Sequence, residues 1–387
     1  MQGRSIIDNV PFSAGARGND GRNRKWKVRR IHELLSNTPA LEPTYNRARS
    51  VIRLFRKSGF YEITQRCNLK CEGCYYFEGG YDAAVGDETS IETWRRFFGE
   101  EQRRGVIMGY FVGAEPALAQ ERLLAAVEHI PFGIIGTNGT IRIDQAVPYR
   151  IQISVWGNDA LDSALRGGSV FRKALRNYQG DRRAIVIYTF NRWNIEDTRN
   201  VAAICHDHGI KITFNIYSPT VAYLRKLHDA IPYGHSVFDV SRSEDSPILD
   251  PVRYAAIRDL SESLMDDFPD TVVYSRAYNR FITAPGPRYV IDSKTGIAEN
   301  CRSRIQGHLI YYKTNLHAAR VKCCTPDVDC IHCRLYSGGW VTRLDPRVED
   351  LDNPTTFQEW LEMVDVFGRI FIYEPRHVAT ETATVES

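Results

Sequence analysis

Short apolar runs alternate with stretches of helical periodicity between residues 60 and 219. The runs are rich in β-branched and aromatic residues and are bounded by polar or glycine-containing segments, which is typical of strands. The intervening stretches repeat apolar residues every three or four positions, which is typical of amphipathic helices. Ser90 stands where a helix N-cap is expected, and Gly209 stands where a helix should end. The predicted strands are 60–65, 106–113, 133–139, 150–157, 184–190 and 211–219.

This alternation predicts an α/β fold with a parallel sheet, because neighbouring parallel strands need a long crossover that is usually a helix. The pattern itself permits either a doubly wound sheet or a sheet curled into a barrel. In both arrangements, ligands bind at the carboxyl ends of the strands. Further along the chain, the periodicity predicts an amphipathic helix over 251–268 and a closing helix over 356–371.

The two ends of the chain look different from this ordered middle. Residues 1–55 are predicted to form a partly disordered arm, because 17–30 is basic and rich in Gly and Asn. A more specific alternative is that this basic segment binds an acidic partner or RNA. The final residues, 379–387, are small and polar and are also expected to be disordered.

Composition narrows the possible functions. With 387 residues and 43% hydrophobic content, the chain can form one large α/β domain and a smaller one. A formal net charge of +3 gives no strong signature of a polyanion ligand, so nucleic acid is not expected as a partner. The chain has neither an apolar run of membrane-spanning length nor the apolar core of a secretory signal near its start. We therefore expect a cytoplasmic protein without a membrane partner.

Nine cysteines carry the strongest chemical signal. In a chain of this size without a secretory signal, clustered cysteines indicate metal ligands rather than disulfides. Cys205 stands alone in a helical pattern and is predicted to be a small core residue. The other eight form two groups: Cys67, Cys71 and Cys74, and then Cys301, Cys323, Cys324, Cys330 and Cys333.

The first group has the spacing CxxxCxxC and directly follows the first predicted strand. Three thiolates this close can hold one face of a four-iron cluster and leave the fourth iron open for a chelating ligand. A structural zinc site would need a fourth Cys or His nearby, and the sequence has none there. The spacing therefore favours an iron–sulfur cluster with an open position.

This CxxxCxxC after a first strand resembles the signature of the radical S-adenosylmethionine (SAM) superfamily. The resemblance extends over about residues 60–220 and implies a partial (β/α)6 barrel, a SAM-binding 4Fe-4S cluster and SAM as cofactor. In that family the cluster splits SAM reductively, and the resulting 5′-deoxyadenosyl radical takes a hydrogen atom from an organic substrate. The resemblance also implies an electron donor such as flavodoxin or ferredoxin.

Further motifs follow in the order of the family. Gly113, Ala114 and Glu115 stand in a GAEP stretch that resembles the family's GGEP, with Ala114 in place of the second glycine. Asn138 stands in a TNG stretch, and Arg166 lies in ALDSALRGG, which loosely resembles the family's DxxRGxGxF. Arg166 is expected to pair with the SAM carboxylate. The complete set of predicted SAM-binding residues is Tyr75, Gly113, Ala114, Glu115, Asn138, Ser154, Arg166, Asn191 and Tyr217.

Each of these residues also has a plain structural interpretation, as a turn glycine, a satisfied strand residue or a surface arginine. One departure from the family affects the prediction. Many relatives carry an aromatic residue just before the third cysteine, where this chain has Gly73. Tyr75, Tyr76 and Phe77 follow that cysteine instead, and they either cover the cluster or belong to the core.

The second group surrounds a predicted hairpin at 308–322, with its turn at a Lys-Thr-Asn sequence. It resembles the twitch and SPASM auxiliary domains of radical SAM enzymes, although the usual turn glycine is missing. The resemblance implies a second iron–sulfur cluster, and a zinc site with four cysteines is the alternative. The expected ligands are Cys301, Cys323, Cys330 and Cys333. Cys324 is an alternative to Cys323, because adjacent residues of an extended chain point in opposite directions.

The expected domains are therefore an arm at 1–55, a radical SAM partial barrel at 56–235, a helical connection at 236–297, a small cysteine-rich β-hairpin and helix domain at 298–345, and a C-terminal helix with a tail at 346–387. The sequence predicts a radical SAM enzyme with an auxiliary cluster that assists electron transfer or substrate binding. A small natural-product intermediate is the favoured substrate and a ribosomal peptide the second. The alternatives are a zinc-stabilised α/β binding protein and an RNA-modifying radical SAM enzyme.

Overall fold

The computed structural model describes residues 24–78, 85–168, 170–229, 247–325 and 327–374. Its strands are β1 (Ser58–Thr64), β2 (Met108–Gly113), β3 (Phe132–Thr137), β4 (Arg150–Val155), β5 (Ala184–Phe190), β6 (Lys211–Ile216) and β7 (Ile310–Tyr312). Its α-helices are α1 (Arg24–Asn37), α2 (Glu42–Leu54), α3 (Ile91–Arg103), α4 (Gln120–Val127), α5 (Asp159–Arg166), α6 (Phe171–Tyr178), α7 (Thr198–Asp207), α8 (Val221–Asp229), α9 (Pro251–Asp267), α10 (Arg276–Thr283), α11 (Tyr336–Arg343) and α12 (Pro354–Phe371). Short 3-10 helices are η2 (Pro39–Leu41), η3 (Pro116–Leu118) and η5 (Glu349–Leu351).

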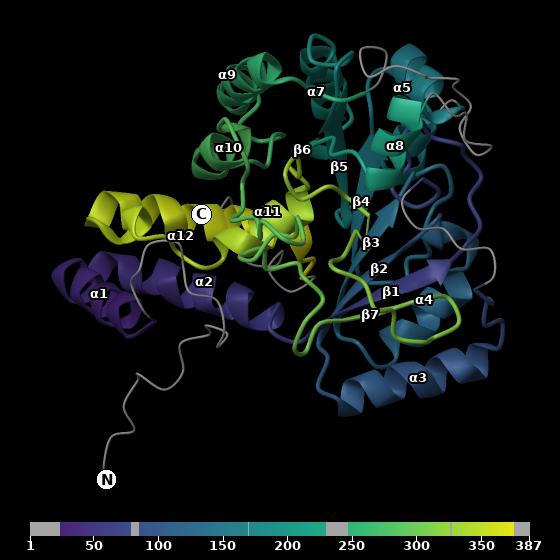
Figure 1. The fold of residues 1–387 in the computed structure, drawn as a ribbon, viewed down its shortest axis with the longest axis horizontal. Helices are drawn as coiled ribbons and strands as arrows, with labels where there is room; N and C mark the ends of the chain where they lie inside the picture. The colour runs from purple at the N-terminus through teal and green to yellow at the C-terminus, as the bar shows by residue number, and fades with distance from the viewer. Residues whose placement is uncertain (1–23, 79–84, 169, 230–246, 326, 375–387) are drawn as a thin grey trace, which may run out of the picture.

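The strands form one parallel sheet in the order β6-β5-β4-β3-β2-β1-β7. Helices connect these strands from β1 to β6 except between β3 and β4, which are joined by a loop, so the predicted α/β class with βα crossovers is confirmed. β7 comes from the cysteine-rich region and pairs in parallel with β1. The sequence predicted a hairpin strand here but not its place as the seventh strand of the sheet. Figure 1 shows the strands side by side, with α3 near the β1 and β7 end of the sheet and α7 near the β5 and β6 end.

One face of every strand contributes to a single cavity. Within β4 and β5 the lining residues are two positions apart, as the two-residue period of a strand requires. Because the cavity touches all seven strands, the sheet curves around it as a partial barrel does. Neighbouring strands supply register partners to its wall: Phe60 with Tyr110, Gly136 with Gln152, Ser154 with Ile187, and Thr189 with Asn215.

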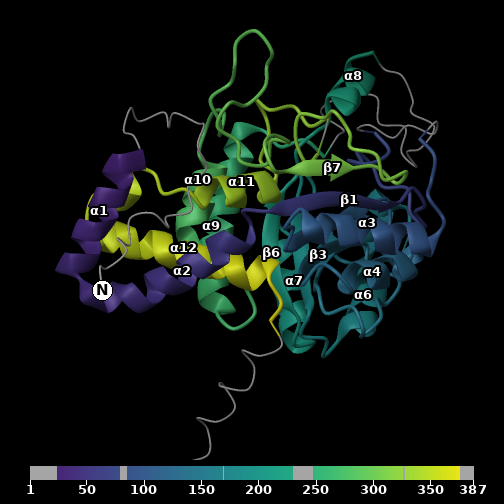
Figure 2. The same cartoon turned by 90° about the horizontal axis from the view of Figure 1, so that it is seen from below.

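A layer of helices lies beside the sheet and differs from the sequence prediction. Residues 24–54, expected to belong to a polar arm, fold into α1 and α2, and α2 packs on α12. Figure 2 shows the three helices gathered on one side of the sheet. Val28, Ile31 and Leu34 are buried at helical spacing, and the basic residues between them obscured this stripe in the sequence. Residues 1–23 lie outside the described part of the chain.

The C-terminal region agrees with the predictions at two helices and differs at the hairpin. α9 and α12 match the predicted 251–268 and 356–371. The predicted hairpin is short: β7 is three residues long, and it meets its return segment at the bridge between Tyr312 and Ala318. Leu316 occupies the left-handed conformation at φ 64°, in the turn where the glycine of the auxiliary-domain motif is missing.

Two smaller predictions are also met. Ser90 caps α3 by accepting a hydrogen bond from the Thr93 amide at 3.2 Å, and Cys205 is fully buried in the main core. None of the helices in the described ranges combines the length and apolar character needed to cross a bilayer. The predicted disordered end, 379–387, lies outside the described residues.

Candidate active site

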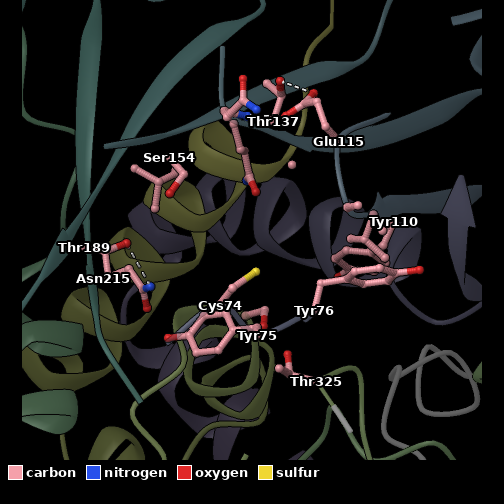
Figure 3. Close-up of a pocket in the computed structure, with 18 of the residues that line it drawn as sticks. Cys74, Tyr75, Tyr76, Tyr110, Glu115, Thr137, Ser154, Thr189, Asn215 and Thr325 are labelled. Carbon is pink, nitrogen blue, oxygen red and sulfur yellow. Dashed lines mark hydrogen bonds between the residues drawn. The ribbon is translucent and has the colours of Figure 1, made fainter. Parts of the chain in front are cut away.

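The central feature of the sheet is a cavity of about 340 Å³ at its carboxyl edge. The loop after β1 forms part of its wall and brings Cys67, Cys71 and Cys74 to it. Figure 3 shows Cys74 and Tyr75 between two walls, with Ser154, Thr189 and Asn215 on one side and Tyr76 and Tyr110 on the other. The sequence motif and the tertiary cavity therefore coincide.

The three thiols lie close enough together for each to affect the others electrostatically. Burial raises the pKa of Cys67 to about 11 and the pKa of Cys74 to about 12, and the neighbouring cysteines add to both shifts. Thiols in this environment keep their protons at neutral pH unless a cation replaces them. Three such thiols facing one open cavity fit an iron–sulfur cluster with a free position.

Tyr217 supports the loop after β1 that carries Cys67, Cys71 and Cys74, which we call the cysteine loop. The Tyr217 hydroxyl donates a hydrogen bond to the Gly73 carbonyl at 3.0 Å. A Cβ on Gly73 would lie 2.0 Å from the Tyr217 hydroxyl oxygen, and Gly73 has a φ of +60°, so this position accepts only glycine. Tyr217 itself is 1% exposed and does not line the cavity. Tyr75, stacked on Tyr217 with ring centroids 5.7 Å apart, faces the cavity instead.

A second support for the loop is a buried charge cluster. Lys226 of α8 lies 3.6 Å from a Glu72 carboxylate oxygen and 3.7 Å from a Glu78 carboxylate oxygen. The same oxygen of Glu78 accepts a hydrogen bond from the Gly73 amide at 3.3 Å. Both carboxylates belong to the cysteine loop, so one lysine holds the two ends of the segment that contains Cys74.

Glu115 forms the polar end of the cavity. Its carboxylate accepts hydrogen bonds from the Thr137 hydroxyl at 2.6 Å, the Asn138 amide at 2.7 Å and the Ala117 amide at 3.0 Å. Burial raises the pKa of Glu115 despite these donors. The Asn138 side chain donates to Asn68 at 2.8 Å, so the GAEP and TNG stretches connect directly to the cysteine loop.

Arg166 provides the positive charge of the cavity wall. It is 4% exposed, lies 3.6 Å from the fully buried Asp162 carboxylate and donates a hydrogen bond to the Ser154 carbonyl. The Arg166 carbonyl lies 3.9 Å from the Cys71 sulfur. Burial lowers the pKa of Arg166, but the neighbouring Asp162 and Cys71 side chains outweigh this effect, so that the pKa is raised. A fixed guanidinium next to the cysteine loop can bind a carboxylate.

The structure brings most of the predicted SAM-binding residues together. Asn191 and Tyr217 are the two that do not reach the cavity wall. Asn191 is fully buried in the turn after β5, where its side-chain oxygen accepts from the Trp193 backbone amide at 3.0 Å and its backbone N–H donates to the Asn194 side-chain oxygen at 2.8 Å. The predicted residues that line the cavity are Tyr75, Gly113, Ala114, Glu115, Asn138, Ser154 and Arg166.

Sequence reasoning missed a second set of polar lining residues. Asn215 donates to the Thr189 hydroxyl at 3.3 Å and accepts from the Tyr336 amide at 3.0 Å. The Tyr336 hydroxyl in turn donates to Gln152. Thr189, Asn215 and Gln152 stand at cavity-facing strand positions, so the period of two could have identified them. Nothing in the sequence places Tyr336, from α11, on the same wall.

Gly136 marks open space in the middle of this wall. It lies on β3, lines the cavity and is exposed, and a Cβ there would meet no atom within 4 Å. The cavity is therefore open at Gly136, next to the TNG stretch.

The second cysteine group lies close to the same cavity. Cys301 and Cys330 are each 8% exposed in a small cluster with Tyr289 and Ala298, against which Cys333 packs. Burial raises the pKa of Cys301 to about 12. The electrostatic neighbours of Cys323 include Cys301 and Cys333. In the described ranges, no three or more His, Cys, Asp or Glu side chains converge closely enough to hold a single metal ion.

Comparisons with known proteins return structures alone. No protein-family model matches the chain, and no curated protein is significantly similar to it in sequence. Streptococcus suis SuiB bound to S-adenosylmethionine is 13% identical with a TM-score of 0.45, over 75% of this chain and 69% of SuiB. SuiB bound to precursor peptide SuiA is 12% identical with a TM-score of 0.46, over 90% and 72%. Native anSMEcpe with bound AdoMet is 14% identical with a TM-score of 0.46, over 84% and 99%. Sequence identities and TM-scores this low do not by themselves assign a function.

Proposed function

We propose that this chain is a radical SAM enzyme that binds a 4Fe-4S cluster through Cys67, Cys71 and Cys74. The observation that carries the proposal is the shared cavity: three thiols, the Glu115 carboxylate and the Arg166 guanidinium line one space at the carboxyl edge of a parallel sheet. When bound, the cluster and SAM supply reductive cleavage of SAM and a carbon-centred radical that takes a hydrogen atom from substrate.

The chain's own residues would bind and orient the cofactor. Arg166 offers two parallel donors to the SAM carboxylate. At the other polar end, Glu115 and the backbone of the GAEP stretch would accept hydrogen bonds from the SAM amino group. Gly136 leaves space on the wall for the adenosine part, with Ser154 and Asn138 beside it. Burial of these groups keeps water away from a reactive carbon.

The region 298–345 would form an auxiliary domain with a second iron–sulfur cluster. Support comes from the burial of Cys301 and Cys330 in one small cluster and from the electrostatic contact of Cys323 with Cys301 and Cys333. β7 joins this domain to the barrel sheet. An electron donor such as flavodoxin or ferredoxin would supply the reducing electron.

For the substrate, we favour a small organic molecule over a ribosomal peptide. Away from Glu115 and Arg166, the described lining is aromatic, aliphatic or neutral and polar, including Tyr76, Tyr110 and Gln152. Such a wall suits an uncharged part of a small substrate. The peptide stays the second candidate.

Anaerobic reconstitution followed by dithionite and SAM tests the proposal. We expect a brown protein with absorption at about 400 nm, iron and sulfide bound to the chain, and release of 5′-deoxyadenosine. Replacing Cys67, Cys71 and Cys74 together with alanine should abolish the release, whereas Cys205→Ala should retain it because Cys205 is buried in the core outside the cavity. A protein with its cluster loaded that releases no 5′-deoxyadenosine, or a colourless protein that binds only zinc, would refute the proposal.

A further inference from the structure

The adjacent residues Cys323 and Cys324 lie in different environments. Cys324 lines the central cavity, and Cys323 does not. Cys323 pairs with Arg304 in a short antiparallel bridge, and its thiol donates to the Thr325 carbonyl at 3.0 Å. Neighbouring side chains of an extended segment point to opposite sides, so Cys324 reaches the cavity and Cys323 does not. Both thiols interact electrostatically with Cys301 and Cys333. Cys324 is thus the one cysteine of that group that reaches the cavity wall.

The surroundings of Cys324 are neutral and hydroxyl-rich. Its sulfur lies 3.7 Å from the Ser337 hydroxyl and 3.9 Å from the Thr325 hydroxyl. The phenol groups of Tyr110 and Tyr311 are close enough to interact with it electrostatically. Among the described lining residues the cationic side chain is Arg166, next to Cys71. Among the described residues around Cys324, no cationic side chain activates it as an anionic nucleophile, and its hydroxyl neighbours allow exchange of the S–H hydrogen with solvent.

We propose that Cys324 is a catalytic hydrogen-atom donor, facing the radical formed in the cavity, and that Cys323 supplies the metal ligand. The proposal rests on the radical SAM function argued above. An S–H bond is weaker than the C–H bonds of a saturated carbon, so transfer of hydrogen from Cys324 to a carbon radical runs downhill.

The transfer balances with one further electron. A carbon radical takes the hydrogen atom from Cys324, which forms a C–H bond, breaks the S–H bond and leaves a thiyl radical. One electron from the neighbouring reduced iron–sulfur centre and one proton from solvent restore the thiol. Cys323 adjoins Cys324 in the chain and interacts with Cys301 and Cys333, so the electron source would lie next to the thiyl sulfur.

Solvent deuterium tests this assignment without knowledge of the substrate. The reconstituted full chain is incubated with SAM and dithionite in D2O, and the 5′-deoxyadenosine is analysed by mass spectrometry. In the absence of substrate, the deoxyadenosyl carbon should take its hydrogen from Cys324, so the wild-type product should gain one deuterium. Cys324→Ser and Cys324→Ala should lower the deuterium content to that of an H2O control, with iron and sulfide per chain unchanged. Cys323→Ala should lose the iron of the second centre.

The controls separate this proposal from the proposed function. Cys205→Ala removes a buried thiol outside the cavity and should keep the deuterium. Release of 5′-deoxyadenosine without deuterium from the wild type would overturn the donor role and leave the radical SAM function standing. Absence of 5′-deoxyadenosine would overturn the function itself. Loss of iron in both Cys324 variants would make Cys324 a ligand, and deuterium retained in Cys324→Ser would point to a tyrosine such as Tyr311. Either result would refute the assignment.

Discussion

Gly136 offers a sharp test of where the cofactor lies. Gly136→Val places three carbon atoms into the open part of a cavity of about 340 Å³, and a Cβ at this position meets no protein atom within 4 Å. The substitution therefore removes space without disturbing the fold. If SAM occupies this space, it must shift or compress. Overpacking of this kind costs about 1–3 kcal/mol, which corresponds to roughly 5- to 150-fold weaker SAM binding.

The stability of the variant should move in the opposite direction. Glycine inside a strand is unfavourable by roughly 0.5–1 kcal/mol relative to alanine, and valine suits a strand. Gly136 has no positive φ that would resist a side chain. Gly136→Val should therefore melt at the wild-type temperature or slightly above it, while binding SAM more weakly.

Isothermal titration of SAM into the cluster-loaded protein, combined with thermal melting, measures both effects. Gly136→Ala should give an intermediate affinity. Gly86→Val is the matched control, because Gly86 also has open space around its Cβ position but lies outside the cavity. Wild-type affinity in a correctly folded Gly136→Val protein would show that SAM does not occupy this wall, and the reasoning would be wrong.

Three further predictions concern buried charges around the cavity. Arg166→Met should lower the free energy of unfolding by about 3–5 kcal/mol, because the buried Asp162 carboxylate then keeps its charge without a partner. In urea unfolding, the double variant Arg166→Met with Asp162→Asn should lose less stability than Arg166→Met alone. An equal loss in the two proteins would contradict this reason. Burial raises the pKa of Glu78 from 4.5 to about 7, so the folded cluster-free protein holds this proton more tightly than the unfolded chain. Its stability should fall as pH rises from about 4.5 to about 7, and Glu78→Gln should flatten that part of the urea-midpoint profile; an unchanged slope would count against it. Tyr311→Phe removes a 2.8 Å hydrogen bond to the Glu62 carboxylate and should lower the free energy of unfolding by about 1.5–3 kcal/mol. A change near zero would contradict this expectation and would mean that Lys313 compensates fully for the lost bond. The Lys313 ammonium also lies 2.8 Å from that carboxylate.

The sequence predicted the sheet well because strand signals are local. Six apolar runs became β1 to β6, with bounds within a few residues. It predicted α1 and α2 poorly, because the buried stripe of Val28, Ile31 and Leu34 alternates with exposed basic residues that dominate the composition. β7 was missed as a sheet strand because its partner β1 lies about 250 residues earlier in the chain, and only tertiary folding brings such segments together.

The same division holds for the cavity. Motifs carried by one short segment, such as CxxxCxxC and GAEP, could be assigned from the sequence because their residues are neighbours in the chain. The wall formed by Gln152, Asn215 and Tyr336 combines two strands and a helix from distant parts of the chain, and no local pattern links them. Tyr217 looked like a cofactor contact and instead fills the space behind Gly73.

The cysteines show most clearly what each level decides. The sequence by itself determined that three thiols follow the first strand with no fourth ligand nearby, because chain spacing alone sets how closely they can approach. It also favoured Cys323 as a ligand with Cys324 as the alternative, since adjacent residues have similar access to a partner until the direction of the backbone is known. Only the tertiary structure decided that Cys324 faces the cavity, because the pairing of this segment with Arg304 and its place beside the cavity fix which side of the extended chain points inward.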